Sequence, residues 1–363
     1  MDSAQLLSLV DALKGRKVAV LGDVVADEFV YGRVARVSRE APVLILEYDS
    51  TEVLAGAGGN AANNVAALGG KASLVATVGR DEPGRRLSAA LDRRVNQRGL
   101  VRTARNTTVK TRILAGGIHS AKQQVVRIDR AVSGALDPAA RALFERRALE
   151  AAMQADAVLV SDYGSGLVTP AIVSKLRAAL RREGRPIPVL VDSRYRLLDY
   201  RGLTACTPNE SEVEQALGVR INDNLPMLER TGRAVLERTG MQAVLITRGS
   251  RGMALFVPDA PTVHIPIFGS DEIADVTGAG DTVMATMTLA LAAGTTFEAA
   301  ARLANYAGGI VVMKRGTATA SAEELRRAIR SDVPRSPIPS PRSPVPDPRS
   351  PIPGPRNKRR VRG

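Results

Sequence analysis

The chain alternates short, uniformly apolar runs with longer segments of mixed polarity. The short runs predict buried strands at 17–22 (KVAVLG), 72–79 (ASLVATVG), 157–162 (AVLVSD), 187–192 (IPVLVD) and 243–249 (AVLITRG), and a further strand ends at the proline of 204–210 (TACTPNE). The longer segments predict helices at 60–70, 83–95, 138–153, 170–182, 210–217, 224–238, 279–293 and 297–313. Strands that alternate with helices indicate βαβ units, so we expect an α/β fold with a central, mainly parallel sheet flanked by helices.

Two segments break this rhythm and alternate polar and apolar residues with the period of a strand. They are 27–49 (DEFVYGRVARVSREAPVLILEYD) and 107–130 (TTVKTRILAGGIHSAKQQVVRIDR), each inserted between α/β units. Such alternation is typical of antiparallel strands with one solvated face. We therefore expect a small antiparallel β sheet outside the main one, serving as a lid over a site.

Composition limits the location and the available chemistry. Of 363 residues 44% are hydrophobic, and no apolar run reaches the ~18 residues of a membrane span. The start carries an acid at position 2 and no long apolar stretch, so we expect no signal peptide. The single cysteine, Cys206, fits the cytoplasm, where we place the protein, with no membrane partner. Two histidines, His119 and His264, do not provide a His-rich zinc site, which leaves acid–base chemistry to Asp or Glu.

Residues 331–363 differ in composition from the rest. RSPIPSP, RSPVPDP and RSPIPGP repeat over 335–355, and RNKRRVRG follows. Eight Lys or Arg and two Asp give this segment +6 of the total charge of +14, which leaves a mildly basic +8 on 1–330. We expect no nucleic-acid partner. Closely spaced prolines block helix, so we expect one domain at 1–330 and a disordered tail at 331–363. The tail is either a ligand for a proline-binding module or an acidic polymer, or a solvated segment without a required role.

Polar clusters follow most of the predicted strands. They are GDVVAD (22–27), SDYGSG (161–166), VDSR (191–194), TPNESE (207–212) and TRGSRG (247–252), together with the glycine turn GAGGN (56–60). Ligands of open α/β sheets bind beyond the carboxyl ends of the strands. Six such clusters therefore predict a ligand site along that edge.

The stretch DVTGAGD (275–281) predicts an anion site at the start of a helix. Gly278 and Gly280 allow a tight turn, and the following amides are the free N–H groups of the helix start. Such amides suit a transferring phosphoryl group, and Asp281 in the first turn suits a general base. Alternatively, Asp281 is only a favourable first-turn acid, and the motif alone does not decide between the two.

Two other phosphate-binding patterns are absent. GRDEPGRR (79–86) has the glycine spacing of Walker A, but Arg85 and Arg86 replace the Lys and the Ser or Thr. The first strand continues as VAVLGDVVAD, without G-x-G-x-x-G. We therefore expect neither a P-loop nor a dinucleotide site.

Four motifs together resemble the ribokinase-like (PfkB) carbohydrate kinases. GAGGNAANNVAALG (56–69) and DVTGAGDT (275–282) look like the two signatures of this family, TPNESE contains its N-x-x-E, and TRGSRG resembles its T-x-G turn. The similarity covers about residues 14–330. It implies a ribokinase-like three-layer fold and ATP-dependent phosphorylation of a sugar hydroxyl with Mg²⁺.

The resemblance also assigns roles to single residues. Asp281 would be the base, and the amides of Gly278, Ala279 and Gly280 would stabilise the transferring phosphoryl group. Asn209 and Glu212 would hold Mg²⁺, and Asp275 and Thr277 a monovalent cation such as K⁺. The nucleotide would contact Asn209, Thr247, Gly249, Gly252 and Asn305. The sugar would contact Asp23, Asp27, Gly58, Gly59 and Asn60.

Within the family, three segments look most like the heptose 7-phosphate kinases of ADP-heptose synthesis for the lipopolysaccharide core: GDVVADEFVYGRVARVSREAPVLILE, KTRILAGGIHSAKQQVVRID and LVSDYGSGLV. This implies D-glycero-D-manno-heptose 7-phosphate as the acceptor and the 1,7-bisphosphate as the product. The chain departs from that pattern at Arg39, where Pro is usual, at Ser165, where Lys is usual, and at Asp192-Ser193-Arg194, where D-P-K is usual. Candidate cations for the substrate phosphate are Lys110, Arg112, Arg127 and Arg194, although for each residue alone ordinary solvated charge is the favoured interpretation.

Two alternatives stay open. The chain could be a kinase for another sugar, sugar phosphate or nucleoside, or a non-catalytic interaction protein that acts through its basic tail. Asp281, Asn209 and Glu212 count against the second, since a binding module needs none of them. No histidine follows residue 330, so we expect no H-x-G-H nucleotidyltransferase activity here. The two-part lid implies a homodimer by resemblance.

Overall fold

A computed structural model of the chain describes residues 2–116, 122–132, 134–269 and 275–332. The chain divides into two compact units, Met1–Arg330 and Ser331–Gly363. The first unit holds the sheets and helices that follow. Residues 117–121 of the second predicted lid segment, with His119, and the repeats of the predicted tail lie outside the described residues.

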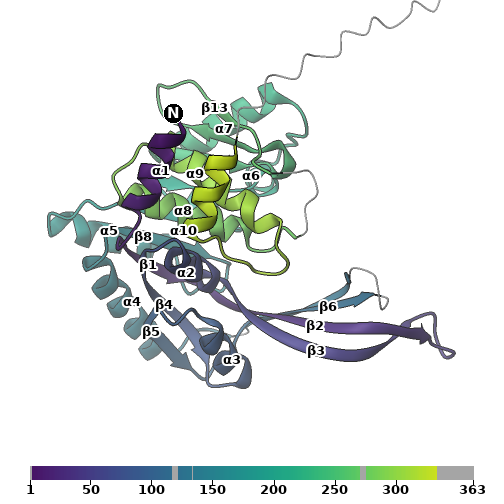
Figure 1. The fold of residues 1–363 in the computed structure, drawn as a ribbon. Helices are drawn as coiled ribbons and strands as arrows, with labels where there is room; N and C mark the ends of the chain where they lie inside the picture. The colour runs from purple at the N-terminus through teal and green to yellow at the C-terminus, as the bar shows by residue number, and fades with distance from the viewer. Residues whose placement is uncertain (1, 117–121, 133, 270–274, 333–363) are drawn as a thin grey trace, which may run out of the picture. The chain divides into compact units, whose positions relative to one another are not determined.

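A nine-stranded sheet forms the middle layer of the first unit (Figure 1). Its strands in chain order are β1 (Lys17–Gly22), β4 (Lys71–Gly79), β5 (Asn96–Thr103), β8 (Ala157–Asp162), β9 (Val189–Ser193), β10 (Ala205–Cys206), β11 (Ala243–Thr247), β12 (Met253–Phe256) and β13 (Val263–Ile265). In space they run β13-β12-β11-β10-β9-β8-β1-β4-β5. The pairings from β5 to β11 are parallel, and those of β12 are antiparallel. The predicted mainly parallel sheet is confirmed.

Helices cover both faces of this sheet, and each face has its own apolar core. One core includes residues of α1 (Ser3–Ala12), α2 (Gly58–Ala67), α3 (Glu82–Ala90), α8 (Ala279–Ala292), α9 (Phe297–Val312) and α10 (Ala322–Ser331). The other includes residues of α4 (Pro138–Met153), α5 (Pro170–Arg182), α6 (Glu210–Leu217) and α7 (Leu225–Thr239). Because strands covered on both faces contact no water, they are apolar throughout, which explains their continuous runs in the sequence. None of the described helices is long and apolar enough to cross a membrane.

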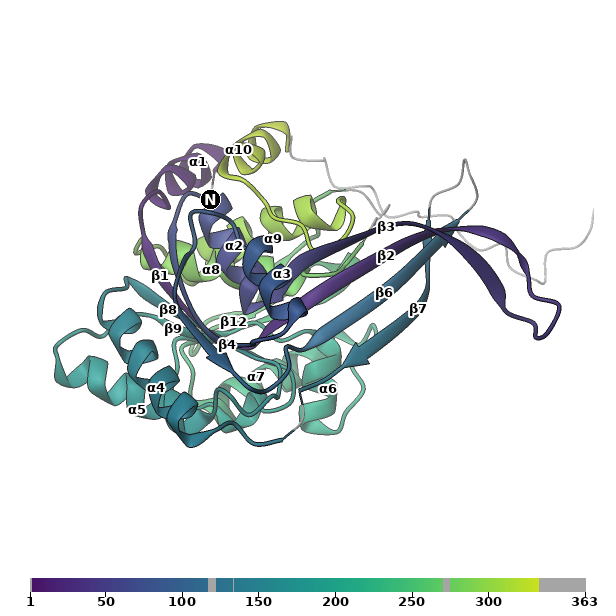
Figure 2. The same cartoon turned by 90° about the horizontal axis from the view of Figure 1, so that it is seen from below.

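A second sheet extends away from the main body (Figure 2). It contains β2 (Val24–Val37), β3 (Leu44–Ala57), β6 (Val109–Gly116) and β7 (Gln123–Arg130), in the order β3-β2-β6-β7. The predicted small sheet is therefore confirmed, with antiparallel hairpins β2–β3 and β6–β7 joined through a parallel β2–β6 pair. The two hairpins run in the same direction because α2, β4, α3 and β5 return the chain to the main body between them. Its role as a lid stays a prediction.

Several elements differ from the sequence prediction. The helix expected over 83–95 ends at Ala90, and strand β5 follows at the sheet edge. Strands β12 and β13 are too short, at four and three residues, to show a period. Helix α10 buries only Leu325, Ala328 and Ile329, so its apolar signal is weak.

Candidate active site

The two signature segments of the sequence meet at Asn60. Its Nδ2 donates to Oδ2 of Asp281 at 3.0 Å and to the carbonyl of Gly278 at 3.1 Å, across more than 200 residues of chain. Gly278 has a left-handed φ of 79°, and a Cβ there would lie 2.5 Å from Asn60 Nδ2. This position therefore requires glycine, both for the turn and for the close approach. The packing of α2 against α8 makes the two motifs one site.

Asp281 is a buried carboxylate held by two donors. The Tyr163 hydroxyl donates to its Oδ1 at 3.0 Å, and Asn60 binds its other oxygen. Burial raises the pKa of Asp281 to about 7, and the hydrogen bonds from Asn60 and Tyr163 oppose that rise. Burial also raises the pKa of Tyr163, so its hydroxyl remains a donor. A carboxylate that titrates near neutral pH is suited to take a proton from a hydroxyl.

Helix α8 begins directly beside this carboxylate. Its first intrahelical bond runs from Thr282 N to the Gly278 carbonyl at 3.1 Å, and no side chain caps the helix. The amides of Gly280 and Asp281 precede that bond and are oriented as the free donors of a helix N-terminus. Ala279 N instead donates to the Val276 carbonyl at 3.2 Å, so this predicted donor is already engaged. The arrangement fits an anion at the helix start.

The predicted sugar-binding residues gather at the base of the second sheet, but several of them contact protein groups. Asp27 forms a buried ion pair with Arg112, at 2.6 Å, and accepts from Thr317 Oγ1 at 3.2 Å. Asp23 accepts from Tyr163 N at 2.8 Å and from the amide and hydroxyl of Ser165. Burial raises the pKa of Asp23 while the bonds from Ser165 oppose it.

Gly58 and Gly59 begin helix α2 close to their neighbours. A Cβ at Gly58 would lie 2.9 Å from the Asp23 carbonyl, and one at Gly59 would lie 3.0 Å from Ala55 Cβ. The small residues therefore have a packing role. Sugar contact by these glycines, Asp23, Asp27 and Asn60 stays a prediction.

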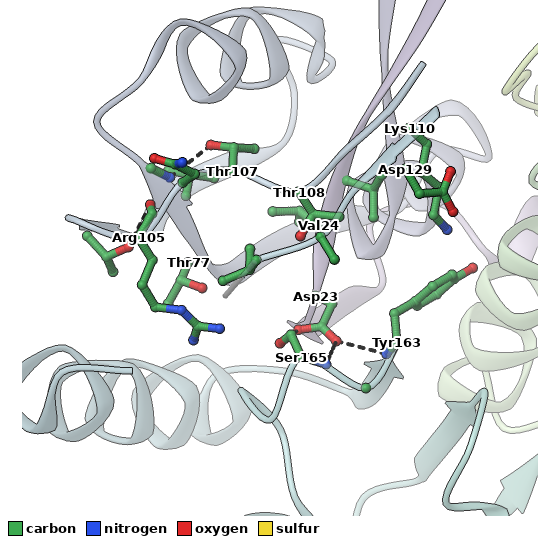
Figure 3. Close-up of a pocket in the computed structure, with 18 of the residues that line it drawn as sticks. Asp23, Val24, Thr77, Arg105, Thr107, Thr108, Lys110, Asp129, Tyr163 and Ser165 are labelled. Atoms are coloured by element: carbon green, nitrogen blue, oxygen red, sulfur yellow. Dashed lines mark hydrogen bonds between the residues drawn. The ribbon is translucent and has the colours of Figure 1, made fainter. Parts of the chain in front are cut away.

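A cavity of about 230 Å³ opens next to Tyr163 (Figure 3). Its basic lining residues are Arg105, Lys110, Arg127 and Arg194, and its acidic ones are Asp23 and Asp129. Three of the four predicted phosphate-binding cations thus share one cavity. The fourth, Arg112, is not among the lining residues, because its guanidinium packs over the Phe29 ring and pairs with Asp27.

The predicted metal residues lie at the start of α6. Asn209 caps this helix and forms a reciprocal pair of hydrogen bonds with Glu212, each 2.9 Å long. Burial raises the pKa of Glu212. Burial and then the charges of Glu212 and Asp281 raise the pKa of nearby Asp192. A divalent cation would relieve this repulsion among carboxylates.

A direct cage for such a cation is not preformed. In the described part of the chain, no group of three or more His, Cys, Asp or Glu residues is placed to hold a metal ion. Mg²⁺ keeps several waters and binds through few carboxylates. The residues present therefore fit a hydrated Mg²⁺ better than a fully coordinated ion, and its binding by Asn209 and Glu212 through water stays a prediction.

The predicted nucleotide residues lie at the end of β11, in the turn after it, at the start of α6 and on α9. Thr247 pairs with Asn209 in a β-bridge, which joins the N-x-x-E and T-x-G motifs. Gly249 has a φ of 57° and open space around its Cα. Position 252 requires glycine for packing, since a Cβ there would lie 2.1 Å from the Ile265 carbonyl. Asn305 is buried and donates to the Pro266 carbonyl at 2.9 Å. Nucleotide contact by these five residues stays a prediction.

The predicted monovalent-cation residues are engaged with each other. Asp275 accepts from Thr277 N at 2.9 Å and from Gly316 N at 3.0 Å. The Asp275 carboxylate thus holds the turn before α8 in place. Its role as a cation ligand stays a prediction.

Two residues in this region were missed by sequence reasoning. Tyr163 belongs to SDYGSG, which was recognised only as a polar cluster, and its contact with Asp281 spans 118 positions. Arg105 lies between β5 and β6, in a segment with no recognisable motif. Only the placement of these segments in space reveals their part in the site.

The sequence of this chain is similar to a described protein family and to named bacterial proteins. A family described as "pfkB family carbohydrate kinase" matches residues 16–325. The "Bifunctional protein HldE" of Caulobacter vibrioides is 42% identical over 330 residues, which cover 90% of this chain and 65% of that protein. The protein of the same name from Geobacter metallireducens is 40% identical, over 90% of this chain and 65% of its own length. The chain thus spans slightly less than two thirds of these relatives.

Solved structures of similar fold include two sugar kinases. Arabidopsis thaliana ribokinase, solved with ribose and ATP, has a TM-score of 0.68 and 20% identity, covering 87% of this chain and 99% of that one. Escherichia coli phosphofructokinase-2, solved with potassium, has a TM-score of 0.69 and 18% identity, covering 87% and 98%. These likenesses confirm the predicted ribokinase-like fold.

Proposed function

Because this chain belongs to the pfkB family of carbohydrate kinases, we propose that it transfers the γ-phosphoryl group of ATP to the anomeric hydroxyl of D-glycero-D-manno-heptose 7-phosphate. The product is the 1,7-bisphosphate, an intermediate of ADP-heptose synthesis for the lipopolysaccharide core. The motif resemblance to heptose 7-phosphate kinases supports this acceptor, as does the similarity to proteins named HldE. Membership of the family confirms the predicted class of the protein and argues against a non-catalytic interaction protein.

One observation carries the proposal: the buried Asp281 carboxylate, in the first turn of α8, accepts from Tyr163, which lines a cavity with four cations. Asp281 takes the proton from the sugar hydroxyl, and the hydroxyl oxygen attacks the γ-phosphorus. The bond from that phosphorus to the β–γ bridging oxygen breaks, and ADP leaves with the electron pair. The Gly280 and Asp281 amides stabilise negative charge on the transferring group. Bound Mg²⁺ supplies charge neutralisation for the β- and γ-phosphates.

An ATP-consumption assay with a sugar panel tests this function. The panel contains D-glycero-D-manno-heptose 7-phosphate, the unphosphorylated heptose, fructose 6-phosphate and ribose. We expect turnover to be highest with heptose 7-phosphate, and Asp281→Asn to abolish most of it. A higher kcat/KM for another sugar would overturn the acceptor assignment and leave a kinase of different specificity.

The cationic cavity supports a preference for a phosphorylated acceptor. A phosphate held by two cations in a partly dry site can change kcat/KM by ~10²-fold or more, at ~1.4 kcal/mol per factor of ten. We expect Lys110→Ala, Arg127→Ala and Arg194→Ala to reduce the preference for heptose 7-phosphate over the free heptose. Equal kcat/KM for the two sugars in the parent would contradict the proposal. A preference that all three substitutions leave intact would show that these cations do not bind the phosphate.

We also propose a homodimer formed through the second sheet. Val37, Tyr48 and Ile128 on this sheet expose 59%, 67% and 47% of their surface, and β7 is exposed along its whole length. A second copy would cover these apolar side chains. Sedimentation equilibrium tests the assembly, and a monomer at all concentrations would refute it.

The remaining parts of the proposal concern ions, domain limits and location. We propose that Mg²⁺ acts with ATP, that K⁺ binds at Asp275 and Thr277, and that residues 1–330 form the kinase domain. We further propose that the protein acts in the cytoplasm. Activity measured with Mg²⁺ omitted, and with K⁺ replaced by Na⁺, tests the two ions separately.

A further inference from the structure

The cavity beside the base contains an arginine with one buried donor that no protein group of the described residues accepts from. Arg105 lies between β5 and β6 and lines the cavity (Figure 3). Its Nε is one of two buried side-chain nitrogen or oxygen atoms without a hydrogen-bond partner in the described part of the chain. A buried donor on a charged group is costly when unpaired. Burial also lowers the pKa of Arg105, which shows the same cost.

The other cations of the cavity already have partners. Arg127 binds both carboxylate oxygens of Asp129, at 2.7 and 2.6 Å. Lys110 lies over the Tyr163 ring, 5.1 Å from its centroid, and Arg194 lies 5.8 Å from the Tyr195 ring. Among the described cations that line the cavity, Arg105 is therefore the one with a buried donor that has no acceptor.

Arg105 also lies at a distinct end of the cavity. Figure 3 shows Arg105 and Thr77 on one side of Asp23, and Tyr163 and Lys110 on the other. Tyr163 contacts Asp281, so the second end adjoins the reacting hydroxyl. The first end is remote from the base and offers a guanidinium together with the Thr77 side chain, which also lines the cavity.

We propose that Arg105 binds the phosphate that the acceptor sugar already carries, at the end of the cavity remote from Asp281. This inference rests on the proposed function, because it requires a phosphorylated sugar as the acceptor. A guanidinium offers two parallel N–H donors that match phosphate oxygens, which a lysine cannot reproduce. Arg105 thereby adds to the specificity for a phosphorylated sugar that Lys110, Arg127 and Arg194 are expected to provide.

The test compares two acceptors in matched variants. The kcat/KM for heptose 7-phosphate and for the unphosphorylated heptose is measured in the parent, Arg105→Ala, Arg105→Lys and Arg102→Ala. Arg102 is the control, since it lies on the neighbouring strand β5, is exposed and donates to Ser88 at 3.2 Å. We expect Arg105→Ala to lower kcat/KM for the phosphorylated sugar by ~10²-fold and to leave the free heptose within ~2-fold, as loss of a charge-assisted bond predicts. Arg105→Lys should recover part of the loss, and Arg102→Ala should match the parent.

A binding measurement without ATP separates substrate contact from a structural role. Heptose 7-phosphate should raise the Tm of the parent and of Arg102→Ala but not that of Arg105→Ala. The role of Arg105 would be overturned if kcat/KM fell equally for both sugars in Arg105→Ala and Arg105→Lys. It would also be overturned if kcat/KM for the phosphorylated sugar did not fall. Failure of the proposed function is distinguishable, because it appears in the parent as no preference for the phosphorylated sugar.

Discussion

Replacing Asp281 with asparagine tests its chemistry and its burial in one variant. The substitution removes the proton acceptor but keeps the side-chain shape. We expect kcat to fall by ~10²–10⁴, the range for removal of a general base. ATP binding should persist, because the amides at the start of α8 remain in place.

The same substitution should stabilise the protein above neutral pH. Burial raises the pKa of Asp281 from 3.8 to about 7. At ~1.4 kcal/mol per unit, this rise of about three units corresponds to a cost of ~4 kcal/mol for the ionised folded state. Between pH 4 and 7 the unfolded chain has released this proton and the folded chain retains it. Stability therefore falls as pH rises through that window, and the cost is complete above pH 7.

Part of this gain is offset by altered hydrogen bonding. The new carboxamide can accept from Asn60, and the Tyr163 hydroxyl can accept from its N–H group in place of donating. A buried polar group that this rearrangement leaves unsatisfied costs ~1–3 kcal/mol. We therefore expect the free energy of unfolding of Asp281→Asn to exceed that of the parent by ~1–3 kcal/mol at pH 8, with no such gain at pH 4.5.

Urea denaturation at the two pH values measures this difference. Asp259→Asn, at an exposed carboxylate, is the control and should follow the parent at both. A gap between Asp281→Asn and the parent that does not change with pH would refute the reasoning about burial. Near-normal turnover of the purified variant would refute the assignment of Asp281 as the base.

Three further changes test other parts of the chain. Tyr163→Phe removes a hydrogen bond that lowers the pKa of Asp281, so the acidic limb of the kcat/KM profile should move to higher pH. Tyr195→Phe is the control, and an acidic limb that does not move in Tyr163→Phe would count against the contact. Arg112→Ala leaves Asp27 buried without its ion-pair partner and should lower the free energy of unfolding, measured in urea, by ~3–5 kcal/mol. Arg127→Ala breaks an exposed ion pair and should lower it by less than ~1 kcal/mol, so equal losses would contradict this reasoning. A chain ending at Asp332 keeps α10 and should match the full chain in Tm and kcat, because the proline repeats have little apolar surface to bury. A Tm lower by several degrees would show that residues 333–363 contribute to stability.

Local patterns in the sequence were enough to predict most of the architecture. Strands such as β1, β8 and β11 are apolar throughout because both faces of the sheet are covered, and this burial appears directly as a run of Val, Leu, Ile and Ala. The DVTGAGD stretch predicted a helix start for a similarly local reason, since Gly278 adopts the left-handed turn before α8. The polar edge strand β5 and the short strands β12 and β13 lack such patterns, and they were missed.

The tertiary structure alone decided which charged groups belong to the site. Arg112 and Arg127 face each other on adjacent strands, and in the sequence they were equal candidates. In the fold, Arg112 is buried against Asp27, while Arg127 pairs with Asp129 at the cavity. Tyr163, Asn60 and Asp281 likewise come from three distant segments. Residue type determines whether a group can be charged, but the energy of that charge depends on burial and on partners, and long-range packing determines both.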